Sequence, residues 1–143
     1  MTKENKELLF KDLCARLPYN VICQVEFREN GKYNSKVMLL SGIFTDEAYF
    51  TTKGGSIYSN EYKPYLFPLS SMTEEQLFEV QEILGKNEIE IEDGFLHIID
   101  SDRNTITYLE ILALLEWFYK NHFDINNLIH KKLAINAIGL NIY

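Results

Sequence analysis

Four oxygen-bearing side chains near residue 100 have the residue types of a calcium-binding loop. Asp100, Asp102 and Asn104 stand at alternate positions, and Glu110 follows at the start of an apolar helical pattern. Calcium is bound by six to eight oxygen atoms, and the EF-hand loop supplies its first side-chain ligands from positions 1, 3 and 5. By residue type and spacing the segment is therefore a candidate metal site.

The segment departs from the EF-hand pattern at both of its most specific positions. Counted from Asp100, position 6 is Thr105 where glycine is needed, and position 12 is Ile111 where glutamate is needed. A strand, rather than a helix, is predicted before the loop. Thr107 and Glu110 have the spacing of a capping box, which satisfies two backbone N–H groups at a helix start. We therefore predict no metal site here, only a turn followed by a helix.

The cysteines and histidines do not have the spacing of a catalytic or metal centre. Cys14 and Cys23 are too few for a zinc site, which uses four grouped ligands, and we expect both to be reduced small hydrophobic residues. His97 alternates with apolar residues on a predicted strand, which indicates a core or interface position. His122 and His130 fall near predicted helix ends, where a positive charge is favoured by the helix dipole.

Motifs of the common enzyme classes are absent from the sequence. There is no G-x-S-x-G nucleophile elbow, no phosphate-binding glycine loop and no dinucleotide fingerprint. We predict no catalytic residue, no cofactor and no metal. An enzyme whose site is assembled from distant residues is kept as an alternative, because such a site leaves no local motif.

The acidic residues are concentrated in the middle third of the chain. The protein has 143 residues and a net charge of −7. Residues 1–71 carry a net charge of +1 and residues 117–143 a net charge of +2, whereas residues 72–116 contain two Lys/Arg against twelve Asp/Glu. A surface of this sign repels phosphate and favours basic protein partners. A solvated face that maintains solubility is the simpler interpretation.

Length and composition indicate a folded protein of one domain. Hydrophobic residues make up 46% and charged residues 24% of the chain, as in globular proteins. The chain contains neither a signal-peptide pattern nor an apolar run long enough to span a membrane. We therefore expect a cytoplasmic protein with no membrane partner.

In the first half of the chain, one helical pattern is followed by segments in which apolar and polar residues alternate as in short strands. Leucines at helical spacing predict a helix over Lys3–Leu17, which Pro18 ends. The loops are predicted at Glu29–Ser35, at Thr45-Asp46 and at Lys53–Ser56. The strands are predicted at Val21–Phe27, Lys36–Phe44, Glu47–Thr52 and, as a proline-bounded edge strand, Tyr62–Leu69. These segments predict a small antiparallel SH3-like barrel or curled sheet over about 21–69, with an open sheet covered by helices as the alternative.

The second half predicts a helix, a hairpin and further helices. Thr73 with Gln76 forms a capping box, and Gly85 ends the helix that follows. Asp93-Gly94 is the favoured two-residue hairpin turn. The hairpin strands are predicted at Glu88–Glu92 and Phe95–Ile99. The next helix is predicted at Tyr108–His122 and is apolar almost all round. Asp124 is predicted to cap a short helix over Ile125–Leu133. A helix of that apolar kind is expected to be buried on most sides.

These elements define an α+β fold class and one domain, 1–143. Within it we expect a barrel-like part over about 19–70 and a helix–hairpin–helix part over about 71–143, with the apolar C-terminal tail packed back onto the body.

Three segments carry a resemblance to a known family. They are DLCARLPYNV (Asp12–Val21), YKPYLFPLSSMTEEQ (Tyr62–Gln76) and WFYKNHFDINNLIHKKLAINA (Trp117–Ala137). In these segments the chain resembles a family of small uncharacterised proteins frequent in gut Bacteroides-type bacteria and their phage-like mobile elements. Asn20 stands where that family usually has glycine, and Ile125-Asn126 where Tyr-Arg is common. The resemblance implies an intracellular bacterial or phage context, and it implies no activity, cofactor or catalytic residue.

The leading functional prediction is a non-catalytic protein-interaction or accessory module with another protein as partner. Its predicted partner surface is aromatic and acidic: Tyr62, Tyr65, Phe67, Glu88, Glu90 and Glu92. The alternative is a small barrel that binds nucleic acid through basic side chains set among tyrosines: Arg28, Lys32, Lys36, Lys53 and Lys63. The excess of acidic residues next to this part makes nucleic acid the less favoured partner.

Overall fold

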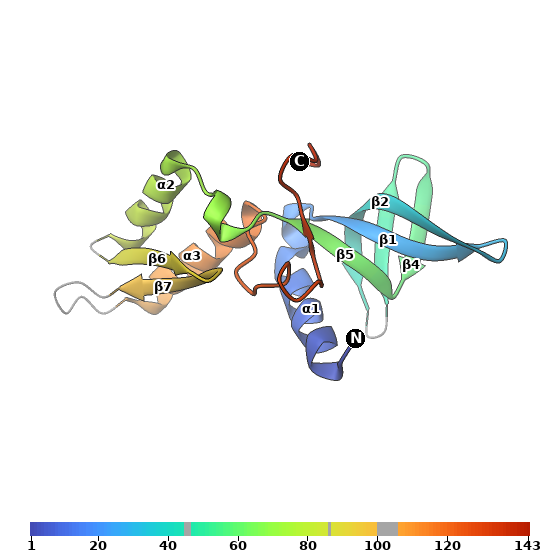
Figure 1. Ribbon diagram of the computed structural model, residues 1–143, viewed down its shortest axis with the longest axis horizontal. Coiled ribbons are helices and arrows are strands. Elements are labelled where there is room, and N and C mark those ends of the chain that lie inside the picture. The colour runs from blue at the N-terminus through green and yellow to red at the C-terminus, as the bar shows by residue number, and fades with distance from the viewer. Residues whose placement is uncertain (45–46, 86, 100–105) are drawn as a thin grey trace.

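The computed structural model describes residues 1–44, 47–85, 87–99 and 106–143, and it confirms the α+β class. A six-stranded sheet forms one end of the molecule, and two helices with a β-hairpin form the other (Figure 1). Helix α1 (Lys3–Arg16) and the C-terminal segment lie between these two ends (Figure 1). The buried apolar residues accordingly fall into two clusters, one at each end.

Helix α1 confirms the predicted N-terminal helix. The Thr2 hydroxyl accepts a hydrogen bond from the backbone N–H of Asn5 at 3.2 Å, which caps the helix start. Leu9 and Leu13 are buried, because they lie one turn apart on the face that meets the sheet. A 3₁₀ turn with proline in its first turn (Leu17–Tyr19) ends the helix and leads into the sheet.

The first two strands form a long hairpin. Strand β1 (Ile22–Glu29) pairs in antiparallel register with β2 (Lys32–Ile43) through a two-residue turn at Asn30-Gly31. Both turn residues have positive φ, 51° and 77°, as the hairpin turn of the primed type requires. The predicted loop Glu29–Ser35 is therefore wrong. Its residues after the turn are exposed on both faces of β2, and they lack the apolar alternation by which strands are recognised.

The sheet continues through β3 (Ala48–Thr52) and β4 (Gly55–Ser59), each antiparallel to its neighbour. The order of strands is β4-β3-β2-β1-β5-β8. The sheet curls far enough for the Ser59 hydroxyl of β4 to donate a 2.7 Å hydrogen bond to the Glu26 carbonyl of β1. No ladder joins β4 to β1 in the described chain, so the sheet is not closed and an SH3-like barrel is not confirmed.

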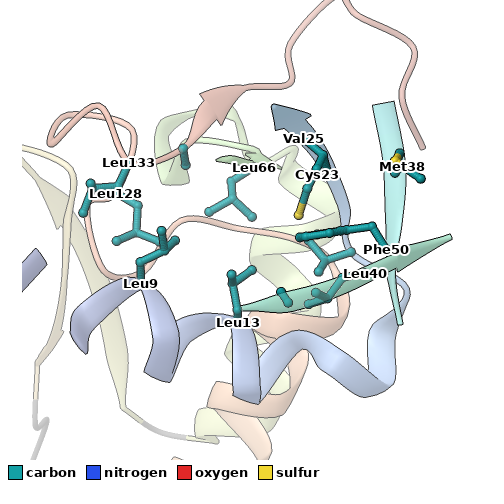
Figure 2. Packing of buried hydrophobic residues seen from close by; sticks show 13 residues of the cluster. Leu9, Leu13, Cys23, Val25, Met38, Leu40, Phe50, Leu66, Leu128 and Leu133 are labelled. Carbon is teal, nitrogen blue, oxygen red and sulfur yellow. The ribbon is translucent and has the colours of Figure 1, made fainter. Parts of the chain in front are cut away.

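Strand β5 (Glu61–Leu66) pairs with β1 on one side and, at Tyr65 and Leu66 alone, with the short strand β8 (Ile135–Asn136) on the other. The predicted strand Tyr62–Leu69 ends at Leu66, three residues earlier than expected. It is an edge strand as far as Pro64, whereas at Tyr65 and Leu66 the short strand β8 covers that edge. The C-terminal tail supplies β8, which confirms that it packs back onto the body. Figure 2 shows the resulting core, in which Leu128 and Leu133 of the segment after α3 meet residues of α1 and of the sheet.

The second end of the molecule is built on two capping boxes and a hairpin. Helix α2 (Glu74–Leu84) begins at Thr73, and helix α3 (Tyr108–Lys120) begins at Thr107, each with the reciprocal hydrogen bonds of a capping box. Strands β6 (Glu88–Glu92) and β7 (Phe95–Ile99) have the predicted bounds and are joined by the predicted two-residue turn. A short 3₁₀ turn (Leu69–Ser71) connects the two ends. The buried residues here are Leu69, Val80, Leu84, Leu114, Phe118 and Phe123.

The helix predicted over Ile125–Leu133 is wrong. Asn127 and Lys132 have φ values of 56° and 61°, and a residue at positive φ interrupts a right-handed helix. Asp124 therefore caps no helix, and its two carboxylate oxygens instead accept the backbone N–H groups of Leu128 and Ile129 at 2.8 and 2.7 Å. The segment is a series of turns held by one buried carboxylate.

Two predicted segments, the Thr45-Asp46 turn and the Asp100–Asn104 loop, lie outside the described residues. Among the helices that the structure describes, none is both long and apolar enough to cross a membrane.

Candidate functional site

Helix α3 exposes a row of large apolar side chains. The exposed fractions of Tyr108, Leu109, Leu112 and Leu115 are 73%, 75%, 43% and 37%. Leu112 is four residues after Tyr108 and three after Leu109, and Leu115 is three residues after Leu112, so the side chains lie on one side of the helix over about two turns. We call this row the α3 face. The prediction that this helix is buried on most sides is wrong.

The opposite side of α3 explains why the helix forms there. Leu114 and Phe118 are buried in the second cluster, together with Val80 and Leu84 of α2. Trp117 is half-buried beside them, and its indole N–H donates to the Glu79 carboxylate at 2.8 Å. Because α2 packs against just one side of α3, the apolar residues on the other side are exposed to solvent.

Helix α1 and the turn after it contact α3 near its C-terminal end. The Arg16 guanidinium lies 5.0 Å from the centre of the Tyr119 ring, and the Tyr19 hydroxyl donates to Glu116 at 3.3 Å. The α3 face lies toward the N-terminal end of the helix, before these contacts. At that end the Thr107 hydrogen bonds hold the pKa of the Glu110 carboxyl below its usual value, so this carboxylate is ionised beside the face.

The predicted acidic residues form one exposed row on the outer face of the hairpin. Glu88, Glu90 and Glu92 alternate along β6 with Ile89 and Ile91, which pack against the second cluster. Across the hairpin the three glutamates face Ile99, His97 and Phe95 of β7. His97 is exposed, so the core position is excluded and the interface position stays a prediction.

The predicted aromatic surface is not an exposed surface. Tyr65 is buried, and Tyr62 is half-buried with its ring 5.2 Å from that of Phe50. Burial raises the pKa of both tyrosine hydroxyls. Phe67 packs at the junction of the two ends, 6.2 Å from Phe123 between ring centres. Tyr62 packs against the first apolar cluster and Phe67 against the second, and Tyr65 is buried, so these side chains stabilise the fold.

The curled sheet has a groove with a volume of about 750 Å³ between the β1–β2 hairpin and β4. Arg28 and Lys36, two of the predicted nucleic-acid contacts, line it together with Tyr33 and Tyr58. Four carboxylates line the same groove: Glu26, Glu29, Glu47 and Glu61. Lys32, Lys53 and Lys63 are not among the lining residues. The groove therefore lacks the excess of positive charge that a phosphate backbone requires.

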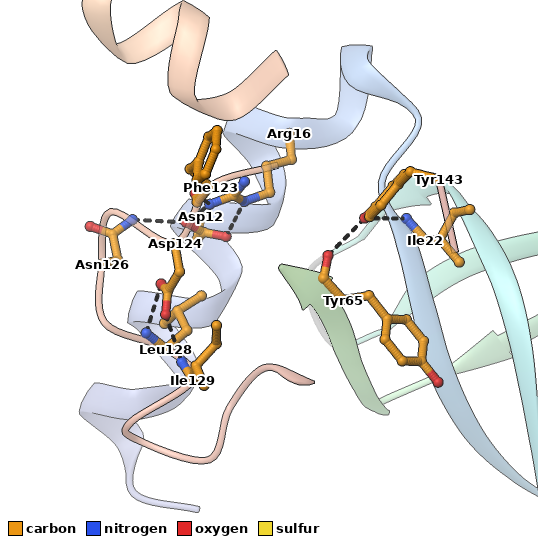
Figure 3. Close-up of polar contacts among 10 residues, drawn as sticks. All are labelled: Asp12, Arg16, Ile22, Tyr65, Phe123, Asp124, Asn126, Leu128, Ile129 and Tyr143. Atoms are coloured by element: carbon orange, nitrogen blue, oxygen red, sulfur yellow. Dashed lines mark hydrogen bonds and ion pairs between the residues drawn. The ribbon is translucent and has the colours of Figure 1, made fainter. Parts of the chain in front are cut away.

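A buried ion pair, which was not predicted from the sequence, joins α1 to the chain after α3 (Figure 3). The Arg16 guanidinium donates to the Asp12 carboxylate at 2.6 and 3.1 Å and to the Phe123 carbonyl at 2.8 Å. The Asn126 amide donates to the same carboxylate at 2.8 Å. The spacing of four residues between aspartate and arginine was the available signal, and it is equally common on exposed helix faces.

His122 lies next to this pair and is not the cation expected from its place near a helix end. Burial and the positive charge of Arg16 lower the pKa of His122 to about 4, so the ring is neutral near pH 7. The ring stacks on that of Tyr143, with 3.9 Å between the centres. The Tyr143 hydroxyl donates to the Tyr65 carbonyl at 2.7 Å and accepts from the N–H of Ile22, which attaches the end of the chain to two strands (Figure 3).

Neither cysteine has the surroundings of a reactive thiol. Cys14 is exposed, Cys23 is fully buried, and the two are not joined by a disulfide. Burial raises the pKa of both thiols, which lowers the fraction of the nucleophilic thiolate. Within the described parts of the chain, no three His, Cys, Asp or Glu side chains are grouped so that they could hold a metal ion.

Comparison with models of known protein families, with curated proteins and with solved structures gave no match. Geometry and charge of the molecule itself are therefore what indicate its function.

Proposed function

We propose that this protein is a protein-interaction module that docks its partner on the α3 face. The observation that carries the proposal is the exposure of Tyr108, Leu109, Leu112 and Leu115 together on one side of one helix. Single exposed apolar residues are ordinary, whereas a contiguous group bordered by polar residues is typical of interaction sites. The class of function is the one predicted from the sequence, but the proposed docking surface is α3 in place of the aromatics Tyr62, Tyr65 and Phe67.

Burial of this face would contribute favourable free energy to binding. Fully burying a leucine side chain contributes about 1.5–3 kcal/mol, and Leu109, Leu112 and Leu115 are each at least one-third exposed in the free chain. Aromatic side chains add contact area at low entropic cost, and Tyr108 stands at the start of the row. These residues also lie on a helix capped by Thr107, so the surface is ordered before the partner arrives.

A site-specific photo-cross-linking experiment tests the proposal. The residue p-benzoylphenylalanine would replace Tyr108 in the full chain, expressed in the cells that naturally produce the protein. The matched control is the same replacement at Tyr33, which is 64% exposed on the β1–β2 hairpin, against 73% for Tyr108. We expect a discrete cross-linked protein at position 108 that is absent at position 33 and is lost when Leu112→Asn is added. Equal labelling at both positions, or none at position 108, would overturn the proposal.

A further inference from the structure

We infer that the segment bound by the α3 face is a cationic amphipathic helix of another protein. This inference rests on the proposed function and specifies the chemistry of the partner. Two features carry it, namely the geometry of the face and the sign of the charge around it.

The geometry of the face favours a helix as the bound segment. The α3 face extends from Tyr108 to Leu115, about two helical turns or roughly 10 Å. The backbone N–H groups behind it are engaged in the helix and its cap, so the face cannot pair with an added strand. It offers rows of side chains three and four residues apart, into which the matching rows of a second helix pack.

The end of the molecule that carries the face is predominantly negative, and Lys120, at the C-terminal end of α3, is the one Lys or Arg among the described residues of 72–123. Among the described residues of 72–116 there are ten acidic side chains and neither Lys nor Arg, because Lys86 and Arg103 lie outside the described residues. The acidic residues are Glu74, Glu75, Glu79, Glu82, Glu88, Glu90, Glu92, Asp93, Glu110 and Glu116. Glu116 lies one turn after Leu112, next to the apolar row itself. Lys or Arg side chains that flank the apolar row of a partner helix therefore meet carboxylates.

The same charge excludes a second copy of this chain as the preferred occupant. Two α3 faces in contact would bring together two segments, 72–116, each with a net charge of −10. Like charges across an interface oppose association, and among the described residues of 72–123 Lys120 alone could offset them. The proposed partner helix is positively charged, whereas a second copy of this chain would present an acidic segment.

Binding of defined peptides to the full chain tests the inference. The probe is a fluorescent amphipathic helix of about 18 residues, or five turns, built from leucine and lysine. One control peptide has glutamate in place of lysine, and a second has the lysine peptide's composition with its leucines dispersed around the helix. We expect the lysine helix to bind at least about tenfold tighter than either control, and its advantage over the glutamate helix to shrink as salt is raised from about 50 to 500 mM.

Two variants locate the binding surface. Leu109→Asn should weaken binding of the lysine helix by about tenfold, the effect of removing one well-placed apolar contact. Phe78→Asn is the matched control, because Phe78 is 64% exposed on α2 outside the α3 face, and it should change the dissociation constant by less than about twofold. Sedimentation of the free protein should show a monomer.

The outcomes separate this inference from the proposed function. Equal binding of the glutamate helix, or equal loss in the two variants, would overturn the cationic-helix inference. A wild-type dimer that Leu109→Asn dissociates would also overturn it, in favour of a second copy. Each of these results leaves the cross-link at position 108 as evidence of an interaction module, whereas the absence of that cross-link removes both proposals.

Discussion

The buried pair of Asp12 and Arg16 allows a quantitative test of what joins the two ends of the molecule. Both side chains are inaccessible to solvent, and the guanidinium has its hydrogen bonds to Asp12 and to the Phe123 carbonyl. Asp12→Ala would leave a positive charge in the interior with no counter-charge beside it, and it would remove the acceptor of the Asn126 amide. Breaking a buried pair on one side costs about 3–5 kcal/mol. Because the whole fold is stabilised by about 5–15 kcal/mol, Asp12→Ala should bring the protein close to unfolding.

The double variant separates the uncompensated charge from the loss of the contact itself. Asp12→Leu with Arg16→Met removes both charges and fills the space with apolar atoms. The remaining cost is the unpaired Phe123 carbonyl and the Asn126 amide, about 1–3 kcal/mol each if they stay dry. The double variant should therefore be destabilised by clearly less than the sum of the two single variants.

Urea unfolding followed by circular dichroism measures these free energies. The wild type, Asp12→Ala, Asp12→Leu, Arg16→Met and the double variant form the set, with the slope m checked for two-state behaviour. A loss below about 1 kcal/mol for Asp12→Ala, or strict additivity of Asp12→Leu and Arg16→Met, would refute the reasoning, because either result means that the charges are solvated.

Three further predictions follow from burial, titration and capping. Leu114→Ala should cost about 2–5 kcal/mol because Leu114 is 3% exposed, whereas Leu109→Ala should stay within about 0.5 kcal/mol, and equal losses in thermal unfolding would contradict the exposed α3 face. His122 has a folded-state pKa of about 4, below its unfolded value near 6.5, so the unfolded chain binds more protons between these values and stability should fall as pH decreases from about 6.5 to 4. His122→Asn, which suits the positive φ of this position, should remove that part of the pH dependence in urea titrations, and an unchanged difference between pH 7 and 5 would disprove it. Thr107→Ala should lower the unfolding free energy by about 1 kcal/mol by leaving the Glu110 N–H without its acceptor, and a loss below about 0.3 kcal/mol would show that water replaces the cap.

Caps, turns and helix bounds that depend on residues close together in the chain could be predicted from the sequence. The caps at Thr73 and Thr107, the Asp93-Gly94 turn and the extent of α1 are all correct. Each depends on hydrogen bonds or backbone angles within about four residues, so the residues that decide it are adjacent in the chain. The Asn30-Gly31 turn was available by the same reasoning and was missed, because the exposed strand after it resembles a loop.

The acidic charge of the region around the candidate site could be predicted from the sequence, but the position of the site on α3 could not. Glu88, Glu90 and Glu92 form the exposed row that their alternation on β6 indicated. Tyr62 and Tyr65 were expected at a surface and are covered instead, since the side on which a strand's aromatics are covered depends on what packs against it.

By itself the sequence determined the α+β class, the caps and turns of its elements and the acidic character of residues 72–116, because all of these are properties of local pattern or of composition. The tertiary structure alone decided which side of α3 is covered and which is left in solvent, since α2 and α1 each reach a different part of that helix. It also decided that Arg16 meets the carbonyl of Phe123, a residue 107 positions away. Burial depends on the distances between segments remote in the chain, and no local pattern contains those distances.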